Sequence, residues 1–313
     1  MQIITFLTKV LHYIPGEISH HIALKGLKVL YLLRLFKFFQ LDNRSCSYVK
    51  QRDITKLSNR VGIAAGLDKN GDYIDCLAAL GISFIEVGTV TPRPQNGNPK
   101  PRIFRNIKDR SLLNRLGFNN KGVDYLVHKL KKRKTSIIVG ASIGKNFDTP
   151  NHKASDDYIY CLKKIYEFSD YVAINISSPN TKSLRDLSSE ENLNYLLQKI
   201  KAEHSLLSSL HGYKPIFVKI SPDESLNNLK LICKSILANN MDGIICSNTT
   251  VDHDSRNGSG GLSGAPLKAK SNNSLENIKH LIGNSLPIIA SGGVMNSADY
   301  LEKLDKGASL VQI

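Results

Sequence analysis

The sequence predicts a (β/α)8 barrel preceded by a two-helix extension. From about residue 61 onward, eight short apolar runs of strand length alternate with amphipathic segments of helix length. Such alternation is typical of a parallel α/β sheet, and a count of eight favours closure into a barrel. A doubly wound open sheet is the alternative, weakened because no GxGxxG motif follows the first strand. The 313 residues, 41% of them hydrophobic, are enough for one such barrel with a large core.

Residues 1–40 are expected to form the helix pair. Apolar side chains recur at helical spacing in residues 3–14, Pro15-Gly16 interrupts the pattern, and a second helical stretch covers residues 17–39. Its latter part is apolar on nearly all sides, with basic residues interspersed. Two interpretations remain open: the helices cap the barrel, or they lie in a membrane interface with their basic groups at the lipid headgroups. Residues 41–60 are expected to form a linker and a small hairpin.

The barrel is expected to occupy residues 61–313. Its predicted strands are 61–65, 83–88, 136–142, 171–176, 215–220, 242–247, 286–291 and 308–313. The helical segments between them include 120–134, 155–168, 189–209, 224–239 and 296–306. Since the sequence stops inside the eighth strand, we expect the final helix of the barrel to be missing from this chain.

Composition and charge disfavour several classes of protein. The five cysteines are scattered, with no CxxC and no His/Cys cluster, so neither disulfides nor a metal site are expected. No apolar run reaches the roughly 18 residues that a spanning helix needs. The net charge of +15 suits nucleic acid or an anionic membrane surface. The densest basic run, at 129–134, ends a helical pattern, where the helix dipole favours cations, and no nucleic-acid module accompanies it. No nucleic-acid partner is therefore expected.

Polar residues collect directly after the predicted strands, on the rim where barrels carry their chemistry. They are Lys69, Thr89, Asn175, Ser178, Asn180, Lys219, Asn248, Thr249 and the glycine pair 292–293. A glycosidase would need paired acids there, and a metal hydrolase would need His and Asp ligands. The amides, hydroxyls and lysines instead suit a planar anionic ligand beside a phosphate-bearing cofactor, with glycine loops at 260–267 and 292–293 near the phosphate. Cofactor-borne redox chemistry fits best.

Motifs along the barrel resemble those of one known family. They are AAGLDKNG, EVGTVTPRPQNGNPKPRIFR, NRLGFNN, INISSPNT, VKISPD, SNTT, GGLSG and GGV…GASLVQI. Together they resemble the class 2 dihydroorotate dehydrogenases, the membrane-associated, quinone-using branch. The resemblance implies an FMN-binding barrel that oxidises (S)-dihydroorotate to orotate in de novo pyrimidine (UMP) biosynthesis and passes electrons from FMN to a quinone. Soluble class 1 members place a cysteine at the base position, where this chain has Ser178.

The resemblance also implies a role for each matching position. Ser178 is the catalytic base, which removes the C5 proton while hydride leaves C6, and its surroundings must activate it because free serine is a poor base. The implied flavin contacts are Ala65, Gly66, Leu67, Asp68, Lys69, Thr89, Ser142, Asn175, Lys219, Ser247, Gly264 and Gly293. The implied substrate contacts are Lys69, Asn114, Arg115, Leu116, Gly117, Phe118, Asn175, Asn180, Asn248 and Thr249. His20 and Arg105 match positions at a quinone tunnel, and no metal is implied.

The implied setting is a monomeric peripheral membrane protein at the cytoplasmic face of the cell membrane, held on anionic lipid by its N-terminal helices. Two departures from the family pattern stand out. Ser142 occupies the position of a flavin-binding asparagine, and the sequence ends before family residues that hold the flavin phosphate. A chain ending there is expected to retain FMN weakly. The alternatives are a soluble dihydroorotate dehydrogenase that uses fumarate or NAD, and an inactive basic barrel fragment that binds membrane or nucleic acid.

Overall fold

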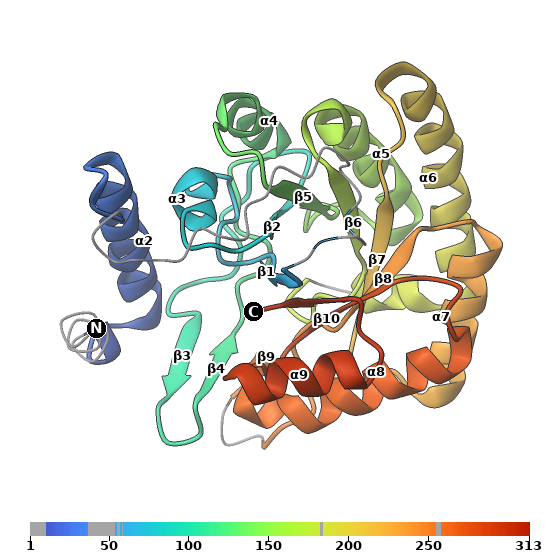
Figure 1. Cartoon of the computed structure of the whole chain (residues 1–313). Helices are drawn as coiled ribbons and strands as arrows, with labels where there is room; N and C mark the ends of the chain where they lie inside the picture. Colours follow the sequence, from blue (N-terminus) through green and yellow to red (C-terminus); the bar gives the residue numbers. More distant parts are fainter. Residues whose placement is uncertain (1–10, 37–53, 55–56, 58, 182–183, 255–257) are drawn as a thin grey trace.

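The computed structural model describes residues 11–36, 54, 57, 59–181, 184–254 and 258–313 and shows a closed barrel of eight parallel strands (Figure 1). In order around the barrel the strands are β1 (Val61–Ile63), β11 (Leu310–Gln312), β10 (Ile288–Ser291), β8 (Gly243–Cys246), β7 (Ile216–Ile220), β6 (Tyr171–Asn175), β5 (Ile138–Ile143) and β2 (Phe84–Val90). The first strand closes the barrel by pairing with both the last strand and the second: Val61 lies opposite Val311 of β11, and Gly62 lies opposite Phe84 of β2. The predicted barrel is confirmed, and the open-sheet alternative is wrong.

Helices surround the barrel, as the periodicity predicts (Figure 1). The α-helices after β1 are α3 (Ile74–Ala78), α4 (Val123–Lys132), α5 (Ala154–Ile165), α6 (Glu190–His211), α7 (Leu226–Ala238), α8 (Lys268–Ile282) and α9 (Ser297–Asp305). Short 3-10 turns are η4 (Asn151–Lys153), η5 (Tyr166–Phe168), η6 (Leu184–Ser188) and η8 (Ala265–Leu267). The basic run at 129–134 does end a helix, since Lys129, Lys131 and Lys132 occupy the last turn of α4.

The second helix of the N-terminal pair is present as α2 (Gly16–Leu32) and lies against the barrel beside α3 (Figure 1). Glu17 in its first turn receives two hydrogen bonds from the Arg102 guanidinium, at 2.7 and 3.3 Å. Lys28 donates to the carbonyl of Asp72 at 3.0 Å. Most of the first predicted helix and nearly all of the 41–60 linker lie outside the described residues. None of the described helices is long and apolar enough to cross a membrane.

A small antiparallel sheet, which the sequence analysis did not predict, lies at the rim. Its strands are β3 (Ile103–Asn106), β4 (Ser111–Asn114) and β9 (Gly261–Gly264). The interpretation of residues 260–267 as a glycine loop is therefore wrong for its central part. Glycine is required in β9 for another reason: a Cβ on Gly264, whose φ is +92°, would lie 2.2 Å from the Arg110 carbonyl oxygen. The close pairing of β9 with β4 needs a residue without a side chain.

Aromatic rings and glycines together fill the amino-terminal part of the barrel interior. The rings of Phe84, Tyr171 and Phe217 are buried there together with aliphatic side chains. Each ring lies where a neighbouring strand carries glycine. A Cβ on Gly140 would lie 2.0 Å from the Tyr171 ring, and one on Gly243 would lie 2.3 Å from the Phe217 ring. The interior is thus a packed core and not a pore, which confines polar chemistry to the carboxyl ends of the strands.

Candidate active site

The barrel interior becomes polar above this aromatic layer. Glu86 on β2 is fully buried, and its Oε2 accepts hydrogen bonds from Gln312 Nε2 at 2.8 Å and from the Tyr171 hydroxyl at 3.3 Å. Its other oxygen lies 3.6 Å from Nζ of Lys219, which is 4% exposed. That distance is too long for a hydrogen bond. Within the described part of the chain, the Lys219 ammonium therefore has a counter-charge but no hydrogen-bond acceptor.

Three side chains from adjacent strands form a polar layer next to Lys219. Asn175 Nδ2 at the end of β6 donates to Thr89 Oγ1 at 2.8 Å, and Thr89 Oγ1 lies 2.9 Å from Ser142 Oγ on β5. Asn175 Oδ1 accepts from the Ser177 backbone N–H at 3.2 Å. All three layer residues are buried. Ser142 thus takes part in the polar layer despite being shorter than the asparagine of the family pattern.

The turn that carries Ser178 is held by asparagines. Ser178 is 6% exposed, and its Oγ accepts from the Asn180 backbone N–H at 3.3 Å. Asn180 Nδ2 donates to Asn114 Oδ1 at 3.0 Å, and Asn248 Nδ2 donates to Ser177 Oγ at 3.1 Å. The structure thus brings the expected base and three expected substrate contacts into one place. Among the described residues, no imidazole or carboxylate is hydrogen-bonded to Ser178 Oγ, so a His–Asp relay of the serine-hydrolase kind is not built here.

The loop after β1 presents a second lysine. Lys69 Nζ donates to Asn119 Oδ1. Burial lowers the pKa of Lys69 to about 7, and the nearby Arg102 guanidinium adds to the shift. The neighbouring Asp68 carboxylate accepts from the backbone N–H groups of Asp72 and Tyr73, at 2.9 and 2.7 Å, so it stabilises the turn before α3. Burial raises the pKa of Asp68 to about 6.

Glycines at two rim segments lie near each other. Gly292 and Gly293 follow β10 with φ values of +100° and +75°, and a Cβ on Gly293 would lie 2.3 Å from Lys268 Cα. Gly264 directly precedes the short turn η8, and Lys268, the first residue of α8, directly follows it. Ser247, also expected near the flavin, donates its backbone N–H to the Ser291 carbonyl at 3.1 Å. The expected phosphate-side residues are therefore neighbours, and a side chain at Gly264 or Gly293 would collide with the backbone next to it.

The remaining expected contacts occupy different surroundings. Gly66, with φ +115°, donates its N–H to the Gly88 carbonyl at 2.9 Å, and Leu67 beside it is exposed. Phe118 is 7% exposed and belongs to the core, while the Leu116 carbonyl accepts from the Asn98 N–H at 3.1 Å. Ala65 is partly buried, and Gly117 has a φ of +66°. Thr249 donates its N–H to Asn248 Oδ1 at 2.8 Å.

A cavity of about 620 Å³ opens beside the Ser178 turn. It is lined by Asn98, Pro99, Lys100, Pro101, Arg115, Pro179, Asn180, Thr181, Ser259 and Gly260. The Arg115 guanidinium lies 4.7 Å from the centre of the Phe104 ring. Among the described residues that line this cavity, two are cationic and none is a carboxylate, which suits the approach of an anionic ligand.

His20 and Arg105 both lie where α2 meets the rim. Arg105 Nη2 on β3 donates to Ser19 Oγ at 2.8 Å, and its Nη1 donates to the His12 carbonyl at 3.2 Å. Burial lowers the pKa of His20, and His21 and Lys69 lower it further. The effect of Lys69 shows that this part of α2 lies close to the loop after β1.

Two charged residues near the site, Glu86 and Asp223, were not predicted from the sequence. Glu86 interrupts the apolar run SFIEVG, and an acid at an inward-facing strand position is a signal that could have identified it. Asp223 follows β7 in the motif VKISPD. Its partners come from loops far apart in the sequence, so no local pattern identifies it. Within the described residues, no group of three or more His, Cys, Asp or Glu could hold a metal ion.

The fold and the rim define a (β/α)8-barrel enzyme with a carboxylate-poor site of amides, hydroxyls, one buried lysine and one half-buried lysine at the carboxyl ends of its strands. Residues 51–313 match the family described as dihydroorotate dehydrogenase. This chain belongs to the dihydroorotate dehydrogenase family.

Curated relatives of this chain carry the name dihydroorotate dehydrogenase (quinone). One from Methylobacillus flagellatus is 44% identical over 96% of this chain and 90% of its own length. One from Vibrio parahaemolyticus is 44% identical over 96% of this chain and 91% of its own length. The chain is also similar to crystal structures of DHODH from Eimeria tenella. The complex with ferulenol has a TM-score of 0.77 at 36% identity, covering 81% of this chain and 75% of that one. The ligand-free form has a TM-score of 0.76 at 37% identity.

Proposed function

We propose that this chain oxidises dihydroorotate to orotate in pyrimidine biosynthesis and passes the electrons through a bound flavin to a quinone. The observation that carries the proposal is that Asn114, Asn180 and Asn248 are hydrogen-bonded around the turn of Ser177 and Ser178, while Lys219 pairs with Asn175 just before that turn. The quinone-type relatives match nearly the whole chain, which supports a quinone as acceptor over fumarate or NAD.

FMN is the flavin that the residues fit. The Lys219 ammonium is buried and has no hydrogen-bond acceptor among the residues that the structure describes, and a flavin ring edge supplies acceptors and, when reduced, negative charge. The flavin ring would be held by side chains at the ends of neighbouring strands: Thr89, Ser142, Asn175 and Ser247. The phosphate would meet the backbone at Gly264 and Gly293. Residues 65–69 would supply further flavin contacts. When bound, FMN supplies the hydride acceptor that the side chains lack.

The remaining residues bind the substrate and move its proton. Ser178 Oγ takes the C5 proton. Because the hydroxyl already carries a proton, it must pass that proton on to a neighbouring acceptor or to water. Asn114, Asn180 and Asn248 donate to and accept from the pyrimidine amides and carboxylate, as amides do in either direction. Lys69 neutralises the substrate's charge, and the cavity beside the Ser178 turn gives the anion a route in.

The charge on Lys69 predicts how ligand affinity depends on pH. With a pKa of about 7, the side chain is charged below pH 7 and loses its proton above it. A bound carboxylate favours the charged form, so orotate affinity is fully present below the pKa of free Lys69, about 7, and falls as the pH rises above it. The limiting slope is about tenfold per pH unit. Titration of orotate against the flavin absorbance measures this, and Lys69→Arg should remove the decline. A flat affinity profile in the natural chain would contradict the assignment of Lys69.

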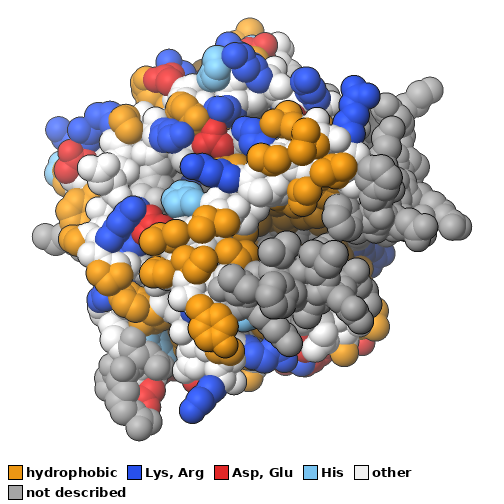
Figure 2. Space-filling view, turned by 90° about the vertical axis from the view of Figure 1, so that its left-hand side faces the viewer, with side chains coloured by type: hydrophobic (Ala, Val, Ile, Leu, Met, Phe, Trp, Pro, Cys, Tyr) orange, Lys and Arg blue, Asp and Glu red, His pale blue; other side chains and the backbone are white. Residues whose placement is uncertain are grey.

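The α2 face suits attachment to a membrane surface. Its apolar side chains are about half or more exposed at Ile18 (53%), Ile22 (48%), Val29 (53%) and Leu32 (67%). Figure 2 shows apolar side chains next to lysines and arginines on this side of the molecule. Such a surface binds the interface of an anionic bilayer. We propose peripheral binding at the cytoplasmic face of the cell membrane, as a monomer. Sedimentation with anionic vesicles and analytical ultracentrifugation test these two points; no binding to vesicles would refute the first.

The proposed activity is tested on the purified chain by its absorbance spectrum. We expect flavin bands that bleach on anaerobic addition of dihydroorotate and return on addition of a quinone. Extraction of the flavin and its mass identify FMN. A yellow protein that dihydroorotate does not bleach would contradict the proposed substrate. Bleaching followed by reoxidation with fumarate or NAD, but not with a quinone, would contradict the acceptor.

A further inference from the structure

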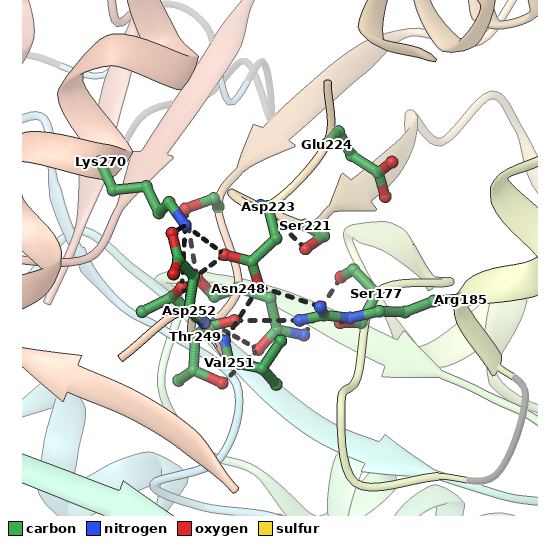
Figure 3. Close-up of polar contacts among 12 residues, drawn as sticks. Ser177, Arg185, Ser221, Asp223, Glu224, Asn248, Thr249, Val251, Asp252 and Lys270 are labelled. Atoms are coloured by element: carbon green, nitrogen blue, oxygen red, sulfur yellow. Dashed lines mark hydrogen bonds and ion pairs between the residues drawn. The ribbon is translucent and has the colours of Figure 1, made fainter. Parts of the chain in front are cut away.

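A carboxylate outside the predicted site, Asp223, joins loops that follow three barrel strands (Figure 3). Asp223 Oδ2 accepts from Arg185 Nη1 and from the Val251 N–H, both at 2.9 Å. Its Oδ1 accepts from Lys270 Nζ at 2.9 Å and from the Thr250 hydroxyl. A carboxylate offers about four lone-pair positions. All of them are filled, and we call these five residues the Asp223 cluster.

The cluster is partly buried and electrostatically strong. The Asp223 side chain is 13% exposed and that of Arg185 is 24% exposed. Burial alone would raise the pKa of Asp223, but hydrogen bonds from Thr250, Lys270, Val251 and Arg185 together hold it below its usual range. Charge-assisted hydrogen bonds with reduced solvent access are the kind that fix geometry.

Arg185 transmits this geometry to the turn with Ser178. Its Nε donates to the Ser177 carbonyl at 3.3 Å, and its Nη2 donates to the Thr249 carbonyl at 3.3 Å. Asn248 Nδ2 in turn donates to Ser177 Oγ at 3.1 Å. One guanidinium therefore connects the backbone next to the proposed base with the loop that carries a proposed substrate contact. Figure 3 shows Arg185 lying between Ser177 and Asp223.

We propose that Asp223 is a positioning residue. Through Arg185 it holds the Ser178 turn and the Asn248 loop in the relative position that proton removal requires. Asp223 has no hydrogen bond to Ser178 in the described structure, so it acts on the reaction only through this connection. The inference rests on the proposed function, since it assumes that Ser178 is the base. A base must lie within about 2.6–3.2 Å of the proton donor, and a displacement of about 1 Å costs about 100-fold in rate.

The test is Asp223→Asn in the flavin-loaded full chain. Asparagine keeps the shape but replaces one acceptor oxygen by a donor that faces a cation. We expect flavin reduction by dihydroorotate to slow by about 10- to 100-fold, with orotate affinity changed less than about threefold. The primary deuterium isotope effect at C5 should increase, because proton removal becomes more rate-limiting. Hydrogen exchange in the peptide around Ser178 should speed up.

Asp170→Asn is the matched control. Asp170 is also buried beside an arginine, with Arg133 Nη2 at 2.9 Å and the Val139 N–H at 2.9 Å, but it precedes β6 at the opposite end of the barrel. Its variant should lose comparable stability while keeping the natural isotope effect. If Asp223→Asn matches Asp170→Asn in rate and isotope effect, Asp223 is only structural and the inference is wrong.

A second variant keeps the test decisive if Asp223→Asn does not fold. Arg185→Lys keeps the charge pair with Asp223 but loses the bonds to Ser177 and Thr249. It should show the same slow reduction and raised isotope effect, and a natural rate would overturn the inference. If dihydroorotate fails to bleach the natural protein, the proposed function itself is what fails. If the natural protein is bleached and both variants behave like it, only the positioning role fails.

Discussion

Replacing Ser178 with alanine is expected to slow reduction of the bound flavin by dihydroorotate by about 10²- to 10⁴-fold, the contribution typical of a general base. The Ser178 hydroxyl lies in a buried turn and accepts one hydrogen bond, from the Asn180 N–H, so its loss removes the proton acceptor without breaking an ion pair. Orotate affinity and the free energy of unfolding should change little, because the interaction lost belongs to the transition state. Anaerobic stopped-flow absorbance measures the reduction rate.

Ser177→Ala is the matched control for this variant. Ser177 is the adjacent residue and receives a hydrogen bond from Asn248, but it is not the proposed base. Its loss should slow reduction by about tenfold at most, as for one neutral hydrogen bond. Equal effects of the two variants would mean that the turn, and not the Ser178 hydroxyl, matters. A Ser178→Ala chain within threefold of the natural rate would show that the proton leaves by another route.

Replacing Lys219 with methionine is expected to have the largest effect on stability. The ammonium is the counter-charge of the fully buried Glu86, 3.6 Å away. Removing one partner of a buried pair costs about 3–5 kcal/mol, because the other charge stays buried and unpaired. The midpoint potential of the flavin should also become more negative, since the reduced ring loses a neighbouring cation. Urea unfolding and potentiometry measure the two effects.

The double variant Lys219→Met, Glu86→Gln separates the two effects. Glutamine at 86 still accepts from Gln312 and Tyr171, so most of the lost stability should return. The potential should not recover, because the cation is still absent. A double variant less stable than Lys219→Met alone would show that the Glu86 charge is not the cause of the destabilisation.

The alternation of elements and the location of the rim could be predicted because they depend on local patterns. All eight predicted strands overlap the barrel strands, and the helical segments at 120–134 and 189–209 contain α4 and most of α6. Since parallel barrel strands bring their carboxyl ends to one rim, residues just after each strand could be assigned to one site without knowing any contact. Asn180 and Asn248 follow from that rule, whereas Asn114 was expected only from the family resemblance and lies at the end of β4 in the small sheet.

The sheet formed by β3, β4 and β9 could not be predicted in the same way. Its strands have four residues each, and β9 begins and ends in glycine. Short glycine-rich segments have weak strand propensity. Pairing with β4, about 150 residues earlier, makes 261–264 a strand, as the opposition of Ser111 and Gly264 shows. The local pattern therefore predicts a loop, and tertiary contact overrides it.

The sequence by itself determined the barrel, the helix that precedes it and the residue types on the rim, because period, spacing and strand polarity are properties of neighbouring residues. Only the tertiary structure decided how these side chains are paired. Gln312 lies 226 positions from Glu86 yet is hydrogen-bonded to it, and Asp223 joins residues 38 positions before it and 47 after it. These pairs form when barrel closure buries polar groups that must then satisfy one another, since an unpaired buried charge is costly. That requirement acts on the folded chain as a whole, and no local stretch of sequence records it.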